Sequence, residues 1–100
     1  MNRARVLVVE DDGSIRTALT AALAAQDWEV RAEPDGRRLL ATVEEFRPDL
    51  AIFDVGLPEG PDGLMLARQL REVTDAPVLF LTAADALDDR LAGFDAGGDD

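Results

Sequence analysis

Short apolar runs alternate along the chain with longer segments in which apolar residues recur at helical spacing. Four of these runs have the length of ordinary strands, about four to eight residues. They cover residues 6–9, 28–32, 50–53 and 78–81. The first, third and fourth runs are continuously apolar, which is typical of parallel strands covered on both faces. The second run alternates apolar with charged residues, which predicts a strand at the edge of the sheet.

Four helical segments are predicted from apolar stripes that fall on one helical face. The stripes consist of Ile15, Leu19, Ala22 and Leu23; Leu39, Leu40, Val43 and Phe46; Leu66, Ala67, Leu70 and Val73; and Leu87, Leu91 and Phe94. Asp12 or Ser14 is expected to cap the first helix, because short polar side chains accept hydrogen bonds from unpaired amides. Asp35 and Asp62 are expected to cap the second and third helices. Strands and helices in strict alternation predict an α/β fold with a parallel sheet and right-handed crossovers.

Composition narrows the possible chemistry. The chain has 100 residues, enough for one small domain. Its 21 acidic and 10 basic residues give a net charge of −11, which argues against nucleic-acid binding. This charge suits a hard cation or a basic partner surface, although acidic surfaces also simply keep proteins soluble. The sequence has no cysteine and no histidine, which excludes disulfides, zinc hydrolase chemistry and a Ser-His-Asp triad.

The first residues of the chain carry no targeting signal. The stretch MNRARVLVVEDD lacks the long apolar segment and the small-residue cleavage site of a signal peptide. No apolar run approaches the length of a membrane span. We therefore expect a cytoplasmic protein that does not bind a membrane.

Candidate chemistry lies at the carboxyl ends of the predicted strands, where ligands bind in open α/β sheets. The first strand is followed by Glu10, Asp11 and Asp12, the third by Asp54 and the fourth by Thr82. If the first and third strands are neighbours, their ends lie about 5 Å apart, and the carboxylates repel unless a cation joins them or a proton stays on. Without histidine or cysteine the natural cation is Mg²⁺. A carboxylate beside Mg²⁺ can act as a nucleophile toward phosphorus, and Thr82 could donate a hydrogen bond to a phosphoryl oxygen.

Each of these features also has a purely structural interpretation. An acid after the first strand caps the following helix, and a lone Asp at a strand end is usually a solvated loop residue. Thr82 is also an ordinary β-branched strand residue. The placement of all of them on successive strand ends favours the functional interpretation.

Four motifs occur in order along the chain: VLVVEDD at residues 6–12, DVGLP at 54–58 followed by Asp62-Gly63, PVLFLTA at 77–83 and GFDAGGDD at 93–100. Together they resemble the receiver domains of response regulators in bacterial two-component systems. The resemblance covers the whole chain, residues 1–100, as one receiver domain. It implies a doubly wound fold with the strand order 2-1-3-4-5.

The resemblance also implies roles for individual residues. Asp54 would accept a phosphoryl group from a sensor histidine kinase. Asp11, Asp54 and the main-chain oxygen of Gly56 would bind Mg²⁺ directly. Glu10 would act through a metal-bound water, and Thr82 would contact the phosphoryl group. The protein would then be a signalling phosphoprotein rather than an enzyme, and a C-terminal DNA-binding output domain that regulates transcription is common in the family.

Two departures from the family pattern affect these expectations. The loop at residues 57–63 is one residue longer than usual. The chain also ends at Asp100, before the expected fifth strand with its Lys-Pro pair. We therefore expect an incomplete phosphoacceptor pocket with slow phosphorylation. The unpaired fourth strand is expected to cause self-association of the truncated form.

Three other functions were weighed. A P-loop or dinucleotide site needs a glycine-rich turn after the first strand, and the stretch Glu10-Asp11-Asp12-Gly13 has one glycine and three acids. An aspartate-nucleophile phosphohydrolase places two acids at the spacing of Glu10 and Asp12, but it leaves Asp54 unexplained. A degenerate receiver that acts only as a protein-interaction module would not need all the acids that this chain retains, but the absence of the family's lysine favours it.

Overall fold

The computed structural model of the chain describes residues 3–81, which form four strands and three helices in alternation. In chain order they are β1 (Arg5–Val9), α1 (Gly13–Ala24), β2 (Glu29–Glu33), α2 (Leu39–Phe46), β3 (Leu50–Asp54), α3 (Gly63–Arg71) and β4 (Val78–Leu81). The longest of these described helices, α1, has 12 residues, whereas a helix needs about 20 to cross a bilayer. None of them could therefore span a membrane.

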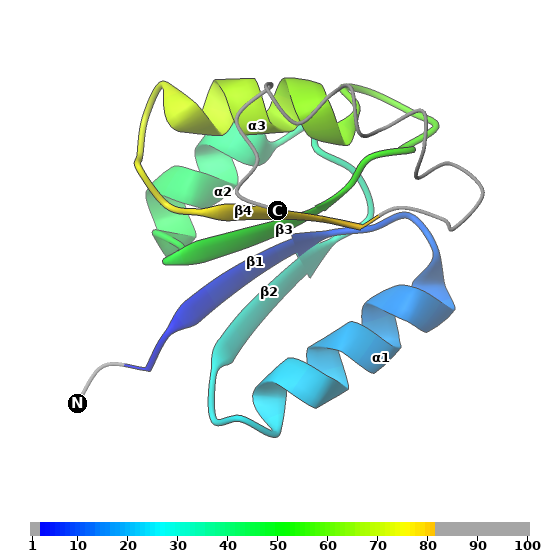
Figure 1. Ribbon diagram of the computed structural model, residues 1–100, viewed down its shortest axis with the longest axis vertical. Helices are drawn as coiled ribbons and strands as arrows, with labels where there is room; N and C mark the ends of the chain where they lie inside the picture. Colours follow the sequence, from blue (N-terminus) through cyan, green and yellow to red (C-terminus); the bar gives the residue numbers. More distant parts are fainter. Residues whose placement is uncertain (1–2, 82–100) are drawn as a thin grey trace.

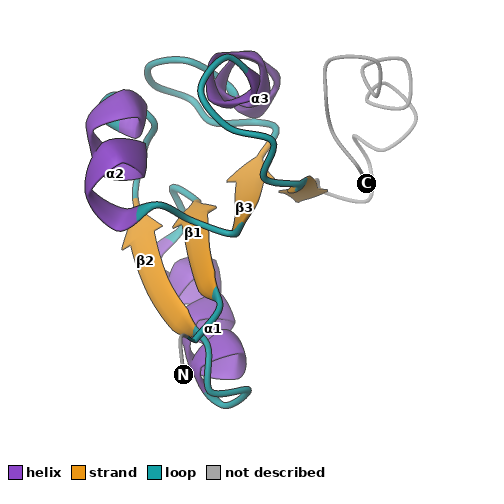
Figure 2. Cartoon of the chain, turned by 90° about the vertical axis from the view of Figure 1, so that its left-hand side faces the viewer, coloured by secondary structure: helices purple, strands orange, loops and turns teal. Residues whose placement is uncertain are grey.

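The four strands form one parallel sheet in the order β2-β1-β3-β4. This confirms the predicted fold class and, as far as β4, the strand order that the resemblance implied. Helix α1 lies on one side of the sheet, and α2 and α3 lie on the other (Figure 1). Figure 2 shows the strands side by side with β2 at one edge, as its alternating sequence predicts. Because all four strands are parallel, their carboxyl ends lie at the same end of the sheet.

Successive residues of β1 enter two different cores, because side chains alternate between the faces of a strand. Leu7 and Val9 belong to the core that the sheet forms with α2 and α3. Val6 and Val8 form a second core with Ile52 on the side of α1. The strands β1 and β3 are therefore buried on both faces, which confirms the interpretation of their continuously apolar sequences.

The strand β4 and the helix α1 are less buried than their sequences predict. Leu79 of β4 is 39% exposed. In α1, Leu19 and Leu23 pack against the second core, whereas Ile15 and Ala22 are exposed. The helix packs against β1 and β2, so on this side of the sheet no described helix reaches β4. The expectation that β4 is covered on both faces is therefore wrong for the described part of the chain.

Helix α2 begins later than predicted, because Asp35 does not cap it. The Asp35 Oδ1 atom accepts a hydrogen bond from the Arg37 amide at 3.0 Å and forms a turn, and the helix begins at Leu39. Leu39 and Val43 are buried, but Leu40 is 54% exposed. Each residue of a helix is rotated by about 100° from the one before it, so Leu40 points away from the stripe on which it was placed.

Helix α3 agrees with its prediction at the start and departs from it at the end. The Asp62 side chain caps the helix by accepting a hydrogen bond from the Met65 amide at 2.9 Å. Val73 lies beyond the last helical residue and is 55% exposed. The other three members of the predicted stripe are buried: Leu66, Ala67 and Leu70.

Some predictions concern residues that the structure does not describe. The fourth helix, with Leu87, Leu91 and Phe94, lies outside the described residues, and so do Thr82 and the motif at 93–100. Self-association through β4 stays a prediction, because it depends on the same part of the chain.

Helix α3 begins in direct contact with the backbone at the end of β3. Gly63 is buried, and a Cβ atom at this position would overlap the carbonyl oxygen of Asp54 and lie 2.9 Å from its carbonyl carbon. Gly13, the first residue of α1, is exposed, and a Cβ atom there would meet only the Arg16 side chain, at 3.6 Å. The close approach of α3 to Asp54 therefore requires a glycine at position 63.

We expect Gly63→Ala to destabilise the domain by about 1–3 kcal/mol, the usual effect of overpacking against groups that cannot move aside. The matched variant Gly13→Ala, also at the first position of a helix, should be neutral or stabilising by up to about 1 kcal/mol. Denaturant unfolding followed by circular dichroism measures both. Equal stabilities for the two variants would contradict the close contact at Gly63.

Candidate functional site

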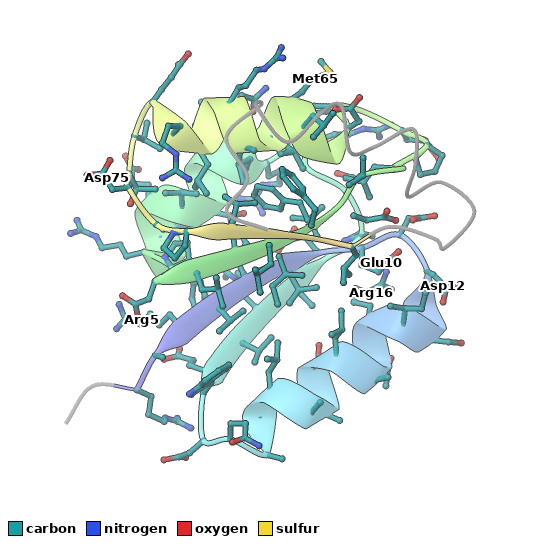
Figure 3. The ribbon with its side chains drawn as sticks, in the orientation of Figure 1. Arg5, Glu10, Asp12, Arg16, Met65 and Asp75 are labelled. Carbon is teal, nitrogen blue, oxygen red and sulfur yellow. The ribbon has the colours of Figure 1, made fainter. Side chains whose placement is uncertain are left out.

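Parallel pairing of β1 with β3 places acidic residues beside each other at the edge of the sheet. Val9 pairs with Phe53, so the next residues along the two strands are Glu10 and Asp54. Carboxylate oxygens of Glu10, Asp11 and Asp54 all lie within 4.8 Å of one another. These three residues are called the carboxylate cluster below. Figure 3 shows Glu10 at the end of the sheet next to the start of α1.

The three members of the carboxylate cluster differ in exposure. Glu10 is only 3% exposed, Asp54 is half-buried, and Asp11 is exposed. The cluster is therefore closed on the side of Glu10 and open to solvent on the side of Asp11.

Glu10 is held by hydrogen bonds at its amide and at its carboxylate. Its N–H group donates to the carbonyl oxygen of Glu33, at the end of β2, at 3.0 Å. Its Oε2 atom accepts a hydrogen bond from the Asp12 amide, also at 3.0 Å. The side chain therefore has one fixed orientation, toward the end of β3.

Burial raises the pKa of Glu10 from its ordinary value of 4.5 to about 7. The hydrogen bond from the Asp12 amide lowers this pKa, because it favours the charged carboxylate. Asp54 raises it, since a protonated Glu10 can donate a hydrogen bond to the Asp54 carboxylate and a charged Glu10 is repelled by it; Asp11 acts in the same direction. Without a cation, the carboxylate cluster therefore keeps a proton on Glu10 up to about neutral pH.

Asp54 is the last residue of β3 and pairs with Leu81 of β4. Its Oδ1 atom accepts a hydrogen bond from the Gly56 amide at 2.9 Å, which orients the carboxylate. Gly56 therefore lies beside the carboxylate cluster, and the contribution of its main-chain oxygen to a metal site stays a prediction. Thr82, which follows Leu81 in the sequence, lies outside the described residues.

Asp12, the third acid after β1, has a different place from its two neighbours. Its Oδ1 atom accepts a hydrogen bond from the Ile15 amide at 3.0 Å and caps α1. Asp12 is not a member of the carboxylate cluster. The structural interpretation of Asp12 as a helix cap is therefore confirmed.

Arg16 is the residue of this region that the sequence analysis missed. Its Nη1 atom donates hydrogen bonds to the main-chain oxygens of Glu10, at 2.8 Å, and of Asp11, at 3.2 Å. Figure 3 shows Arg16 and Glu10 close together at the start of α1. The available signal was an arginine in the second turn of a helix that directly follows an acidic strand end.

The loop that follows Asp54 is joined to the connection between β2 and α2. Glu59 forms an ion pair of 2.9 Å with Arg37, and Gly60, at a φ of 73°, lies so close to Arg37 that a Cβ atom would be 3.2 Å from its Cγ atom. The Arg37 side chain is 58% exposed and that of Glu59 is 73% exposed, so the ion pair adds little stability. It does connect the loop after Asp54 to the segment between β2 and α2.

The donor atoms of the carboxylate cluster suit a small hard cation. Carboxylate oxygens are the ligands that Mg²⁺ prefers, and it typically combines one or two carboxylates with several waters. The open side at Asp11 leaves room for those waters and for an oxygen of a substrate. Burial is the main cause of the raised pKa of Glu10, and the repulsion by Asp54, which a bound cation would offset, is a smaller one.

Comparison with known proteins places this geometry in one family. The family model of the response regulator receiver domain matches residues 6–100 of this chain. Response regulator MprA of Mycolicibacterium vanbaalenii is 43% identical over 97 residues, which are 96% of this chain and 42% of the relative. The chain thus spans 42% of the length of the curated relatives it matches.

Solved structures agree with this assignment. The BeF3-activated N-terminal receiver domain of RstA from Klebsiella pneumoniae is 33% identical and superposes with a TM-score of 0.83, covering 94% of this chain and 80% of that one. A putative response regulator from Chloroflexus aurantiacus is also 33% identical, with a TM-score of 0.88 and coverages of 99% and 83%. Receiver domains typically bind Mg²⁺ and are generally not classed as enzymes. With its parallel sheet and the acids at the ends of β1 and β3, the chain belongs to the response regulator receiver domain family.

Proposed function

We propose that this chain takes up a phosphoryl group on Asp54 and thereby relays a signal from a histidine kinase. The observation that carries the proposal is the convergence of Glu10, Asp11 and Asp54 within 4.8 Å at the carboxyl ends of β1 and β3. Of the three, Asp54 is the best nucleophile. Its carboxylate is oriented by the Gly56 amide, whereas Glu10 is protonated up to about neutral pH.

Asp11, Asp54 and the main-chain oxygen of Gly56 would hold the cation, and Glu10 would act through one of its waters. When bound, Mg²⁺ neutralises the charge of the carboxylates and of the incoming phosphoryl oxygens. The hydrogen bonds to Glu10 and Asp54 keep both carboxylates oriented while the site is being filled. Thr82 would contact a phosphoryl oxygen with its hydroxyl group.

In the proposed step, a carboxylate oxygen of Asp54 attacks the phosphorus atom of a phosphohistidine on the kinase. A P–O bond forms as the P–N bond breaks, and the imidazole takes up a proton as it leaves. The product is an acyl phosphate on Asp54. Because the Asp54 carboxylate is only half-buried, a phosphohistidine can approach it from the open side of the cluster.

The aspartate-nucleophile phosphohydrolase is the other candidate function, and the position of Asp12 weighs against it. That mechanism needs a second acid two residues after the nucleophile, but the Asp12 carboxylate accepts the hydrogen bond that caps α1. A domain that acts only through protein contacts would have no use for a buried Glu10 with a raised pKa, which costs stability.

The receiver family implies a cognate histidine kinase as partner. We propose that residues 1–100 act as one receiver domain in the cytoplasm, where proteins of this family typically work. The matched relatives extend well beyond the aligned segment, and we propose a C-terminal DNA-binding output domain that regulates transcription in the native protein.

Incubation with acetyl phosphate and Mg²⁺ should place a hydroxylamine-labile phosphoryl group on Asp54. Asp54→Asn should abolish the label, because an amide is not a nucleophile toward phosphorus. Asp12→Asn is the matched control; it keeps an oxygen that can cap α1 and should be labelled like the wild type. Mass spectrometry of peptides locates the modification. Loss of the label in Asp12→Asn alone would favour the phosphohydrolase.

Mg²⁺ should stabilise the folded domain by about 1.4 kcal/mol at a concentration tenfold above its dissociation constant. Asp11→Asn should lose this response, because it removes a carboxylate from the cluster. Asp75→Asn is the matched control, since Asp75 is an exposed acid just before β4. It lies at the amino ends of the strands, away from the cluster (Figure 3). Thermal melts with and without Mg²⁺ measure the effect. The same Mg²⁺ response in both variants would count against a specific site.

In metal-free buffer, Glu10 should make stability fall as the pH rises. Between pH 4.5 and about 7 the folded chain holds a proton that the unfolded chain releases. The contribution of Glu10 is therefore full below pH 4.5 and lost above about 7, and its size is on the order of 3 kcal/mol.

Glu10→Gln keeps an acceptor for the Asp12 amide and should remove this part of the pH dependence. Glu44→Gln, at an exposed position of α2, is the control that should leave it intact. Denaturant unfolding at a series of pH values compares the three proteins. Parallel curves for the wild type and Glu10→Gln would show that the pKa of Glu10 is not raised.

A further inference from the structure

We propose that Arg16 is a positioning residue that shapes the metal site through the main chain of Glu10 and Asp11. The inference rests on the proposed function, because it concerns the cation that the carboxylate cluster would hold. It goes beyond that function by giving a role to a residue of α1 that lies outside the cluster.

One nitrogen atom of Arg16 joins two consecutive peptide groups. Its Nη1 atom donates to the carbonyl oxygen of Glu10 at 2.8 Å and to that of Asp11 at 3.2 Å. The amide of Arg16 donates to the carbonyl oxygen of Asp12 at 2.9 Å. All three acids after β1 therefore have their carbonyl oxygens bonded to this one residue, and the acidic turn cannot rotate independently of α1.

This contact matters most for Asp11. The side chain of Glu10 is held by the Asp12 amide, and that of Asp54 by the Gly56 amide. The main-chain oxygen of Asp11 accepts a hydrogen bond from Arg16, and its side chain also interacts with the carboxyl group of Glu10. The direction in which the exposed Asp11 carboxylate leaves the backbone is thus set by Arg16.

Arg16 also differs from the arginines that pair with acids on the surface. Arg5, Arg31 and Arg37, for example, form ion pairs with Glu29, Glu45 and Glu59. Within residues 3–81, Arg16 forms no ion pair and donates only to carbonyl oxygens. It therefore orders the acidic turn without occupying any of the carboxylate oxygens that a cation needs. Partners that orient ligands in this way typically change metal affinity by about 10–100-fold when they are removed.

Positioning and simple charge repulsion predict opposite results when Arg16 is removed. Arginine side chains carry a positive charge, so Arg16 repels a nearby cation. If it acted only through that charge, its removal would tighten Mg²⁺ binding. If it positions the ligands, its removal weakens Mg²⁺ binding although a repulsive charge has gone.

The experiment is calorimetric titration of Mg²⁺ at pH 8, where Glu10 is ionised, together with metal-free unfolding of each variant. Arg16→Met, which keeps the length of the side chain but has no donor, should bind Mg²⁺ about tenfold or more weakly. Arg16→Lys keeps a charge and a donor and should bind Mg²⁺ more tightly than Arg16→Met. The control Arg68→Met removes an exposed arginine of α3 and should leave the affinity unchanged.

Unchanged or tighter Mg²⁺ binding by Arg16→Met, even with lower folding stability, would overturn the proposal, and so would Arg16→Lys binding more weakly than Arg16→Met. If Arg16→Met does not fold, Arg16→Ala, which also has no donor, carries the same test with the same outcomes. A wild-type protein that binds no Mg²⁺ would overturn the proposed metal site as well. A wild type that binds Mg²⁺ with an Arg16→Met variant that binds equally well would overturn this inference alone.

Discussion

The mutual repulsion of three carboxylates at one edge of a parallel sheet is the constraint around which this domain is organised. The pairing of β1 with β3 makes the crowding unavoidable, because the strands end side by side with Glu10 and Asp54 as neighbours. Several local features moderate it. Burial and the nearby acids keep a proton on Glu10, and the amides of Asp12 and Gly56 each donate to one carboxylate of the pair. These contacts reduce the repulsion within the cluster in the absence of a cation.

Much of the fold could be predicted from the periodicity of the sequence, because β1 and β3 are buried on both faces and β2 lies at an edge. The order of the strands could not, since periodicity contains no information about which strands are neighbours; here it came from a family resemblance. The predicted helix caps show another limit. Asp35 and Asp62 are the same residue type before similar stripes, but only Asp62 caps a helix. At Gly36 a Cβ atom would collide with the side chain of Leu66, so the packing of α3 constrains this turn.

The candidate site shows the same division. Its acids could be predicted from their positions at strand ends, but Arg16 could not, because it acts on carbonyl oxygens that every residue possesses. The adjacent acids Asp11 and Asp12 also look equivalent in the sequence. One residue further along the turn is enough to bring the Asp12 carboxylate to the amide of Ile15 and away from the cluster. Such differences depend on backbone geometry, which residue type alone does not specify.

The titration of Glu10 has a practical consequence for counting protons. The chain contains no histidine, cysteine or tyrosine, and all of its basic side chains are arginines, so no other side-chain type that ordinarily titrates between about pH 6 and 10 is present. Uptake of a cation by the carboxylate cluster near neutral pH would expel the Glu10 proton into solution. In a weakly buffered sample that proton becomes a label-free signal of cation binding, and it should be larger below pH 7 than above it.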